Sequence, residues 1–116
     1  MIRVCLLDDD ASCLMTVGRL IKKICRDCDV RTFVSPHDAL DHYVTEDLPD
    51  FVLSDFKMPM MNGVSFIDEM RKLGYNGPAY IFTGRLEPIE ATTPISGIIQ
   101  KPLQMDVFRE ILRSVH

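Results

Sequence analysis

The sequence predicts an α/β protein built on a doubly wound, mainly parallel sheet. Short apolar runs alternate with amphipathic segments along all 116 residues. The first run, at 2–7, is almost continuously apolar, as expected of a strand that helices cover on both faces. We find no repeat, linker or low-complexity segment, so a single domain spanning 1–116 is expected.

The elements follow in order along the chain. Strands are expected at 2–7, 30–34, 51–54, 79–83 and 97–100. Apolar residues recur at helical spacing between and after them. These stripes are Leu14, Val17, Ile21 and Ile24; Ala39, Leu40, Tyr43 and Val44; Val64, Ile67 and Met70; and Phe108, Ile111, Leu112 and Val115. Pro36 suits the first turn of the second helix, and the third helix is expected to end near Gly74.

Composition limits the classes of function. A net charge of -4 and a pI of about 5.2 argue against direct nucleic-acid binding. No apolar run approaches the roughly 20 residues needed to cross a bilayer, so no membrane association is expected. The N-terminal "MIRVCLLDDD" is not a signal peptide, because its short apolar run ends in acids. We therefore expect a cytoplasmic protein.

The four cysteines are expected to be reduced, incidental thiols. They are Cys5, Cys13, Cys25 and Cys28. Cys25 and Cys28 form a CxxC, and with His37 and His42 they give C-x2-C-x8-H-x4-H. The gap from cysteine to histidine is too short for a zinc finger, and a predicted strand divides the pairs. A thioredoxin-like role is disfavoured because the CxxC follows the first helix instead of preceding it.

Polar side chains gather at the predicted strand ends. They are Asp8, Asp9 and Asp10 after the first strand, Asp55 after the third, Thr83 after the fourth and Lys101 after the fifth. Each is commonplace alone, since a strand-end aspartate usually caps a helix or a turn. Parallel strands bring their carboxyl ends to one edge, where ligands bind at a topological switch point. The combination favours phosphoryl transfer to an aspartate, with Mg²⁺ held by oxygen ligands.

Four stretches carry a family resemblance: "VCLLDDD", "FVLSDFKMPMMNG", "YIFTG" and "IIQKP". Together they resemble the response-regulator receiver domain of two-component signalling. The resemblance implies a flavodoxin-like (CheY-like) five-stranded parallel sheet in the order 2-1-3-4-5. It also implies a histidine kinase or phosphotransfer protein as the phosphoryl donor, and an output protein or output domain that the sequence does not identify. Such a domain is a signalling phosphoacceptor, not an enzyme, and catalyses only its own phosphorylation and dephosphorylation.

The resemblance also implies a role for each site residue. Asp55 would be the phosphoacceptor; Asp9 would ligate Mg²⁺ directly and Asp8 mainly through water. Lys57 would offer its backbone carbonyl to the metal. Thr83 would be the switch hydroxyl, with the small Gly84 beside it, and Lys101 would pair with the phosphoryl oxygens. A cis Lys101–Pro102 peptide is expected, and Asp10 is interpreted as a helix N-cap.

Two regions depart from the family pattern. Ile98 stands where the family often has a switching Tyr or Phe. Pro88 and Pro94 predict that the helix between the strands at 79–83 and 97–100 is short, irregular or missing. Lys57 and Arg85 occupy positions that tune dephosphorylation in the family, and a purely solvated role for both is an equal alternative.

Two other functions remain open. Asp8-x-Asp10-x-Ser12 resembles the signature of haloacid-dehalogenase-type phosphatases, with Asp8 as nucleophile and Asp10 as acid/base. No acidic pair follows Lys101 to complete that metal site, and the chain leaves little room for that family's larger core and cap. A non-phosphorylated interaction module on the same fold is the third possibility, ranked below a working receiver.

Overall fold

The computed structural model describes residues 1–84 and 88–113. Their strands form one five-stranded parallel sheet in the order β2-β1-β3-β4-β5, as expected. The strands are β1 (Arg3–Leu7), β2 (Asp29–Phe33), β3 (Phe51–Asp55), β4 (Ala79–Thr83) and β5 (Gly97–Gln100). Every residue of β3, the central strand, is buried, which fits the three apolar residues with which it begins.

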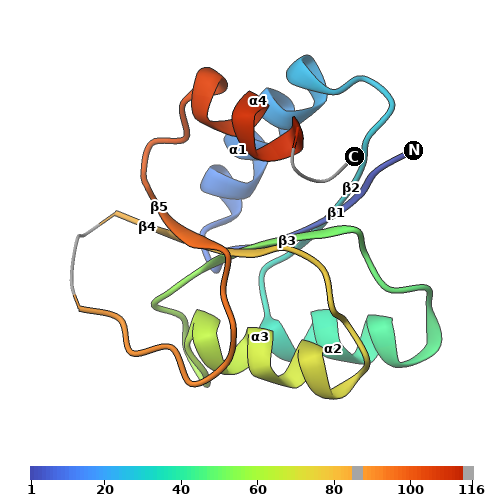
Figure 1. The fold of residues 1–116 in the computed structure, drawn as a ribbon, viewed down its shortest axis with the longest axis vertical. Helices are drawn as coiled ribbons and strands as arrows, with labels where there is room; N and C mark the ends of the chain where they lie inside the picture. The colour runs from blue at the N-terminus through green and yellow to red at the C-terminus, as the bar shows by residue number, and fades with distance from the viewer. Residues whose placement is uncertain (85–87, 114–116) are drawn as a thin grey trace.

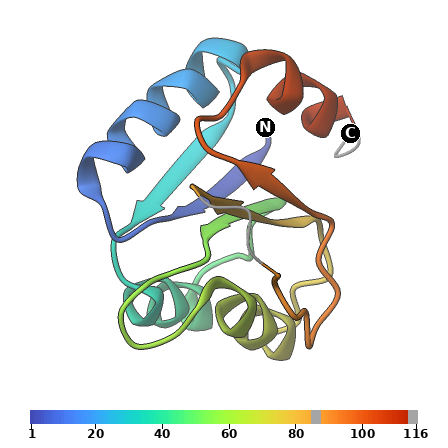
Figure 2. The same cartoon turned by 90° about the vertical axis from the view of Figure 1, so that its left-hand side faces the viewer.

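Helices cover both faces of the sheet. They are α1 (Ala11–Ile24), α2 (Pro36–Thr45), α3 (Gly63–Lys72) and α4 (Met105–Arg113). Helices α1 and α4 lie on one face, and α2 and α3 lie on the other (Figures 1 and 2). The side chains of Asp10, Ser35 and Asn62 cap α1, α2 and α3 by accepting backbone N–H bonds, which satisfies donors at the helix starts. No helix among the described residues is both long and apolar enough to cross a bilayer.

Each face of the sheet has its own apolar core. The cluster under α1 and α4 includes Leu14, Val17, Ile21, Phe51, Phe82, Phe108 and Ile111. The cluster under α2 and α3 includes Ala39, Tyr43, Val52, Ile67, Met70 and Ile81. The predicted stripes therefore face the cores, with one exception. Val44 is 66% exposed, so its assignment to the buried stripe was wrong. Val115 lies outside the described residues.

The connection between β4 and β5 carries no helix in its described part, 84 and 88–96, which fits the expectation of a short or missing helix. The chain instead runs beside α3 (Figure 2), and Ile89 and Ile95 pack against the second cluster. Arg71 fixes it to α3, because its guanidinium donates to the carbonyl oxygen of Pro94 at 2.8 Å. The same guanidinium donates to the carbonyl of Gly77 at 2.7 Å. This bridge was not predicted from the sequence.

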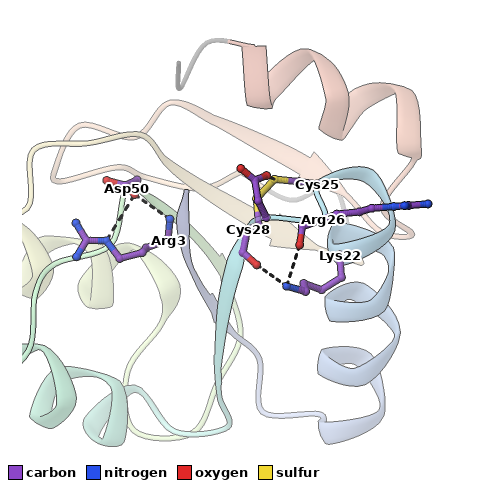
Figure 3. Close-up of a disulfide and its surroundings, with 7 residues drawn as sticks. Arg3, Lys22, Cys25, Arg26, Cys28 and Asp50 are labelled. Carbon is purple, nitrogen blue, oxygen red and sulfur yellow. Dashed lines mark hydrogen bonds and ion pairs between the residues drawn. A yellow bond between two sulfur atoms is a disulfide. The ribbon is translucent and has the colours of Figure 1, made fainter. Parts of the chain in front are cut away.

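Cys25 and Cys28 form a disulfide at the end of α1, so the expectation of free thiols at these two positions was wrong (Figure 3). The turn after α1 brings their Cα atoms within 5.4 Å, which is within the range for a disulfide. The argument from cellular compartment could not anticipate this local geometry. Cys5 and Cys13 remain free, as expected, and Cys5 is fully buried.

Candidate functional site

Three carboxylates from two strand ends meet at one edge of the sheet. Asp8 and Asp9 follow β1, and Asp55 is the last residue of β3. One oxygen atom from each of the three lies within 4.8 Å of the others. The parallel pairing of Leu7 with Ser54 holds the two strand ends level, so that the acids arrive side by side. The predicted convergence of these residues is therefore present in the fold.

Lys101, directly after β5, places a cation beside Asp8 and Asp55. Lys101 Nζ lies 2.8 Å from Asp8 Oδ2 and 3.5 Å from Asp55 Oδ1. The backbone of Lys101 is held next to β4, where its N–H donates to the Thr83 carbonyl at 2.8 Å. The Lys101–Pro102 peptide is cis, as expected. One ammonium thus bridges two buried acids that come from different strands.

Asp10 is separate from the cluster. Its side chain is exposed and accepts the backbone N–H of Ser12 at 2.9 Å, which caps α1. The Asp10 N–H in turn donates to Asp8 Oδ1 at 2.9 Å. The cap therefore orients Asp8, and the interpretation of Asp10 as an N-cap is confirmed.

The electrostatics of the site distinguish Asp55 from Asp8. Burial, followed by the negative charge of Asp8, raises the pKa of Asp55 from 3.8 to about 6. Lys101 and the Phe56 N–H oppose this shift without cancelling it. Burial would raise the pKa of Asp8 too, but hydrogen bonds from Lys101, the Asp10 N–H and Cys13 outweigh it and lower that pKa. Of these two acids, Asp55 is therefore the one whose ionised form is less stabilised by its surroundings.

The same acids also shift the pKa of Lys101. Burial acts to lower the pKa of its ammonium, but the hydrogen bond to Asp8 and the charge of Asp55 raise it instead. Lys101 is therefore firmly protonated, and it neutralises only one of the charges gathered here. A further cation at this edge would relieve the remaining repulsion.

The loop from β3 to α3 fixes the position of Asp55. The Gly63 N–H donates to the Phe56 carbonyl at 2.9 Å, which folds the loop back on the strand end. A Cβ at Gly63 would lie 2.3 Å from the Asp55 carbonyl oxygen, so only glycine fits. Sequence reasoning assigned no role to Gly63, although "MNG" before a helix was the available signal. Met60 in this loop adopts a φ of 81°, in the left-handed region.

Thr83, Gly84 and Lys57 lie at or just after the ends of β4 and β3, toward the same edge of the sheet. Thr83 is buried at the end of β4, and an added Cβ at Gly84 would meet no atom within 4 Å. Lys57 is exposed two residues after Asp55. Arg85 lies outside the described residues. Ile98 is 45% exposed on β5, where it offers no ring.

The donor set suits a hard divalent cation. Three carboxylates supply only oxygen ligands, and Mg²⁺ prefers oxygen while keeping several waters. Burial and the charge of Asp8 both raise the pKa of Asp55, so a further cation here would favour its ionised form. The residues present therefore fit a magnesium ion, although their individual roles are taken up below as proposals.

Comparison with known families identifies this arrangement. Residues 4–113 match the model of the response regulator receiver domain. The chain belongs to the response-regulator receiver domain family. Receiver domains accept a phosphoryl group in two-component signalling, so the chain is a phosphoacceptor domain of that kind.

Curated relatives agree with this assignment. The receiver domain is 30% identical over 83 residues to the transcriptional regulatory protein PrrA of Mycobacterium tuberculosis, a match that covers 72% of this chain and 34% of PrrA. It is 32% identical over 79 residues to sporulation initiation phosphotransferase F of Bacillus subtilis, covering 65% of this chain and 63% of that protein. The match thus spans about a third of PrrA and under two thirds of the phosphotransferase.

Solved structures show the same fold. A response regulator receiver domain (CheY-like) from Methylobacillus flagellatus superposes with a TM-score of 0.87 at 19% identity, covering 100% of this chain and 99% of that one. The haloacid-dehalogenase alternative is not favoured, because the family match is to receivers and the Asp10 side chain caps a helix. The alternative of a non-phosphorylated module is likewise not favoured.

Proposed function

We propose that this receiver domain takes a phosphoryl group from a phosphohistidine onto Asp55 and then changes its protein contacts. The observation that carries the assignment to Asp55 is its place among Asp8, Asp9 and Lys101, which arrive from β1 and β5. Of Asp8 and Asp55, Asp55 is the acid whose ionised form this site stabilises less, since its pKa is raised while that of Asp8 is lowered. A bound phosphoryl group and its cation would supply that compensation.

The proposed reaction is a direct displacement at phosphorus. A carboxylate oxygen of Asp55 forms the new O–P bond as the N–P bond to the donor histidine breaks, and the imidazole leaves with the electron pair. Lys101 donates to a transferred oxygen, after giving up part of its contact with Asp55. Thr83 would donate its hydroxyl to another transferred oxygen, and Gly84 leaves open space beside it.

Mg²⁺ would be held by Asp9 and Asp55 directly, by Asp8 mainly through water, and by the backbone carbonyl of Lys57. When bound, the ion would offset the charge on the carboxylates and on the phosphoryl oxygens. Asp8 suits an indirect role because both of its oxygens already accept bonds, from Asp10 and Lys101. The chain's catalysis would be limited to its own phosphorylation and dephosphorylation.

The partners follow from this chemistry. A histidine kinase or a phosphotransfer protein would be the donor, and an output protein or output domain would read the switched surface. We place these events in the cytoplasm, without direct contact to nucleic acid or membrane, in line with the acidic net charge of -4. Since Ile98 has no ring to rotate, the switch would depend on movement of Thr83 and β5 themselves.

Labelling with an acyl phosphate in Mg²⁺, read as the mass gain of one phosphoryl group, tests the assignment. Asp55→Asn should abolish labelling, while Asp10→Asn, which keeps a capping side chain, should label like the parent protein. Asp8→Asn should weaken the Mg²⁺ dependence. Labelling that survives in Asp55→Asn but disappears in Asp8→Asn or Asp10→Asn would refute the proposal and restore the phosphatase alternative.

A further inference from the structure

The Cys25–Cys28 disulfide lies at the end of the sheet opposite the carboxylate cluster. Cys25 caps the C-terminus of α1, and Cys28 directly precedes β2 (Figure 3). Because parallel strands all run from this end toward Asp8 and Asp55, a five-residue strand of roughly 15 Å separates the two places. Neither the fold nor the phosphoryl chemistry accounts for a disulfide here.

The turn that contains the disulfide is held by hydrogen bonds that do not need it. The Cys25 N–H donates to the Ile21 carbonyl at 2.8 Å, and the Cys28 N–H donates to the Cys25 carbonyl at 3.2 Å. Lys22 Nζ donates to the carbonyls of Cys28 at 2.6 Å and Arg26 at 3.3 Å. These bonds would remain after the S–S bond is broken, so the backbone can hold both redox states.

The start of β2 is anchored independently as well. The Asp29 N–H donates to the Ile2 carbonyl at 2.8 Å, and Cys28 packs within the first core cluster at 1% exposure. A reduced Cys28 would stay there as a small hydrophobe. The disulfide closes a loop with a sequence separation of only 3, and such short loops give less entropic stabilisation than long ones. We therefore expect the fold to persist when this bond is reduced.

The two cysteine residues differ in burial. Cys25 is partly exposed, whereas Cys28 is buried. Lys22, Lys23 and Arg26 are exposed residues close to Cys25 in sequence, and their charges offset that of Asp27 when an anionic thiolate approaches. Asp27 Oδ1 lies 3.4 Å from Cys25 Sγ, so a reduced Cys25 thiol would have an acceptor for its proton. This arrangement gives an attackable sulfur paired with a protected one.

We propose that Cys25 and Cys28 form a reversible dithiol–disulfide site that exchanges with dithiol reductants, independently of the phosphoryl site. A reductant thiolate attacks Cys25 Sγ, the Cys25–Cys28 bond breaks, and Cys28 leaves as a thiolate that takes up a proton. The second reductant thiol then displaces Cys25 from the mixed disulfide. Two electrons and two protons pass to the protein, and the reductant becomes a disulfide.

Dithiothreitol treatment of the native protein, followed by alkylation and peptide mass mapping, tests this proposal. The untreated protein should show Cys25 and Cys28 joined, and the treated protein should carry an adduct at Cys25 with unchanged far-UV circular dichroism. Alkylation at Cys25 should be at least about tenfold faster than at Cys28, because only the exposed thiol is accessible. Finding both thiols free in air-oxidised protein, or reduction only at urea concentrations that unfold it, would overturn the proposal.

A matched pair of variants tests the order of attack. Cys28→Ser leaves the exposed sulfur alone and should form a mixed disulfide with oxidised glutathione quickly, while Cys25→Ser should do so slowly. Equal rates in the two variants, or at the two positions of the parent protein, would show that the proposed asymmetry is wrong. The mass readout needs neither Mg²⁺ nor a phosphodonor, so it succeeds or fails separately from the proposed function. Beryllofluoride binding in Mg²⁺ should be the same in both redox states, and a difference would refute the independence of the two sites.

Discussion

The Lys101 ammonium lies 2.8 Å from the carboxylate of Asp8, although 93 positions separate the two residues in the sequence. The pair joins the last strand of the sheet to the first strand end. Since Asp8 is only 2% exposed, Lys101 provides most of the compensation for its charge in the metal-free protein. The same contact thus serves the stability of the fold and the electrostatics of the site.

Replacing Lys101 with alanine should destabilise the metal-free protein by about 2–3 kcal/mol, because it leaves the buried Asp8 carboxylate without its cation. Urea unfolding at neutral pH measures this change. The matched control is Lys72→Ala, since Lys72 pairs with Asp68 and Glu69 on an exposed surface and its loss should change stability far less. Equal losses in the two variants would show that burial of Asp8 has no effect.

Asp55→Asn should stabilise the metal-free protein by roughly 2–3 kcal/mol at pH 7.5, since raising the pKa of Asp55 from 3.8 to about 6 costs about 1.4 kcal/mol per pKa unit. The pKa of Asp55 is about 6 in the fold against an ordinary 3.8, so the folded state binds more protons between these values. Stability therefore falls as pH rises through this window, and the advantage of the variant should shrink below about pH 4. Thermal unfolding of the variant and the parent protein across this pH range measures the difference in stability.

Two controls accompany this prediction. Asp41→Asn, at an exposed position of α2, should change stability little at any pH. Saturating Mg²⁺ should stabilise the parent protein more than Asp55→Asn, because the ion would bind the carboxylate that the variant lacks. The lowered pKa of Asp8 acts in the opposite direction, since its contribution is present above the ordinary pKa and is lost as pH falls. An advantage that grows on acidification would contradict the assignment to Asp55.

Gly63→Ala and Gly84→Ala should differ in their effect on stability. The new Cβ at Gly63 would lie 2.3 Å from the Asp55 carbonyl oxygen, whereas at Gly84 it would meet nothing within 4 Å. We expect Gly63→Ala to cost about 2 kcal/mol or more in stability, and Gly84→Ala to change it by less than about 0.5 kcal/mol. Denaturant unfolding compares them. A neutral Gly63→Ala would mean that the loop after β3 can move away from the strand.

Arg71→Ala should loosen the connection before β5 and destabilise the protein by about 1–3 kcal/mol, because three carbonyls lose a charged donor. These are the carbonyls of Tyr75, Gly77 and Pro94. Amide hydrogen exchange should accelerate in 88–96 and remain slow in β1 and β3. Arg113→Ala is the control, since Arg113 forms an ion pair with Glu110 in which both side chains are exposed. Unchanged exchange in 88–96 would rule out the proposed bridge.

The sequence was most informative where one short segment determines the outcome. Apolar runs located the strands, and the polar residues after them identified Asp8, Asp55 and Lys101, because parallel strands end at one edge. Strand order came only from the family resemblance. The cis Lys101–Pro102 peptide had the same origin.

Features that depend on distant or three-dimensional contacts were not predicted. Arg71 looks like an ordinary last-turn cation of α3, and only the folded chain shows its contact with Pro94. Cys25 and Cys28 were expected to be reduced because a cytoplasmic protein was expected, whereas the turn after α1 brings them close enough to form a disulfide. Val44 follows Leu40 by one helical turn, but Leu40 is only half-buried and Val44 is 66% exposed. In each case the missing information was the path of the chain between elements.

The connection from β4 to β5 also bears on the order in which the chain folds. A crossover helix forms within about a microsecond from local contacts, but the described part of this connection offers none. β5 must therefore find β4 through contacts distant in sequence, such as those of Arg71 with Pro94 and of Lys101 with Asp8. We expect β1 to β4 to assemble first, so that Asp8 and Asp55 come together before Lys101 arrives. During that interval a divalent cation would be the available counterion, and its presence should speed the earlier step that brings Asp8 and Asp55 together.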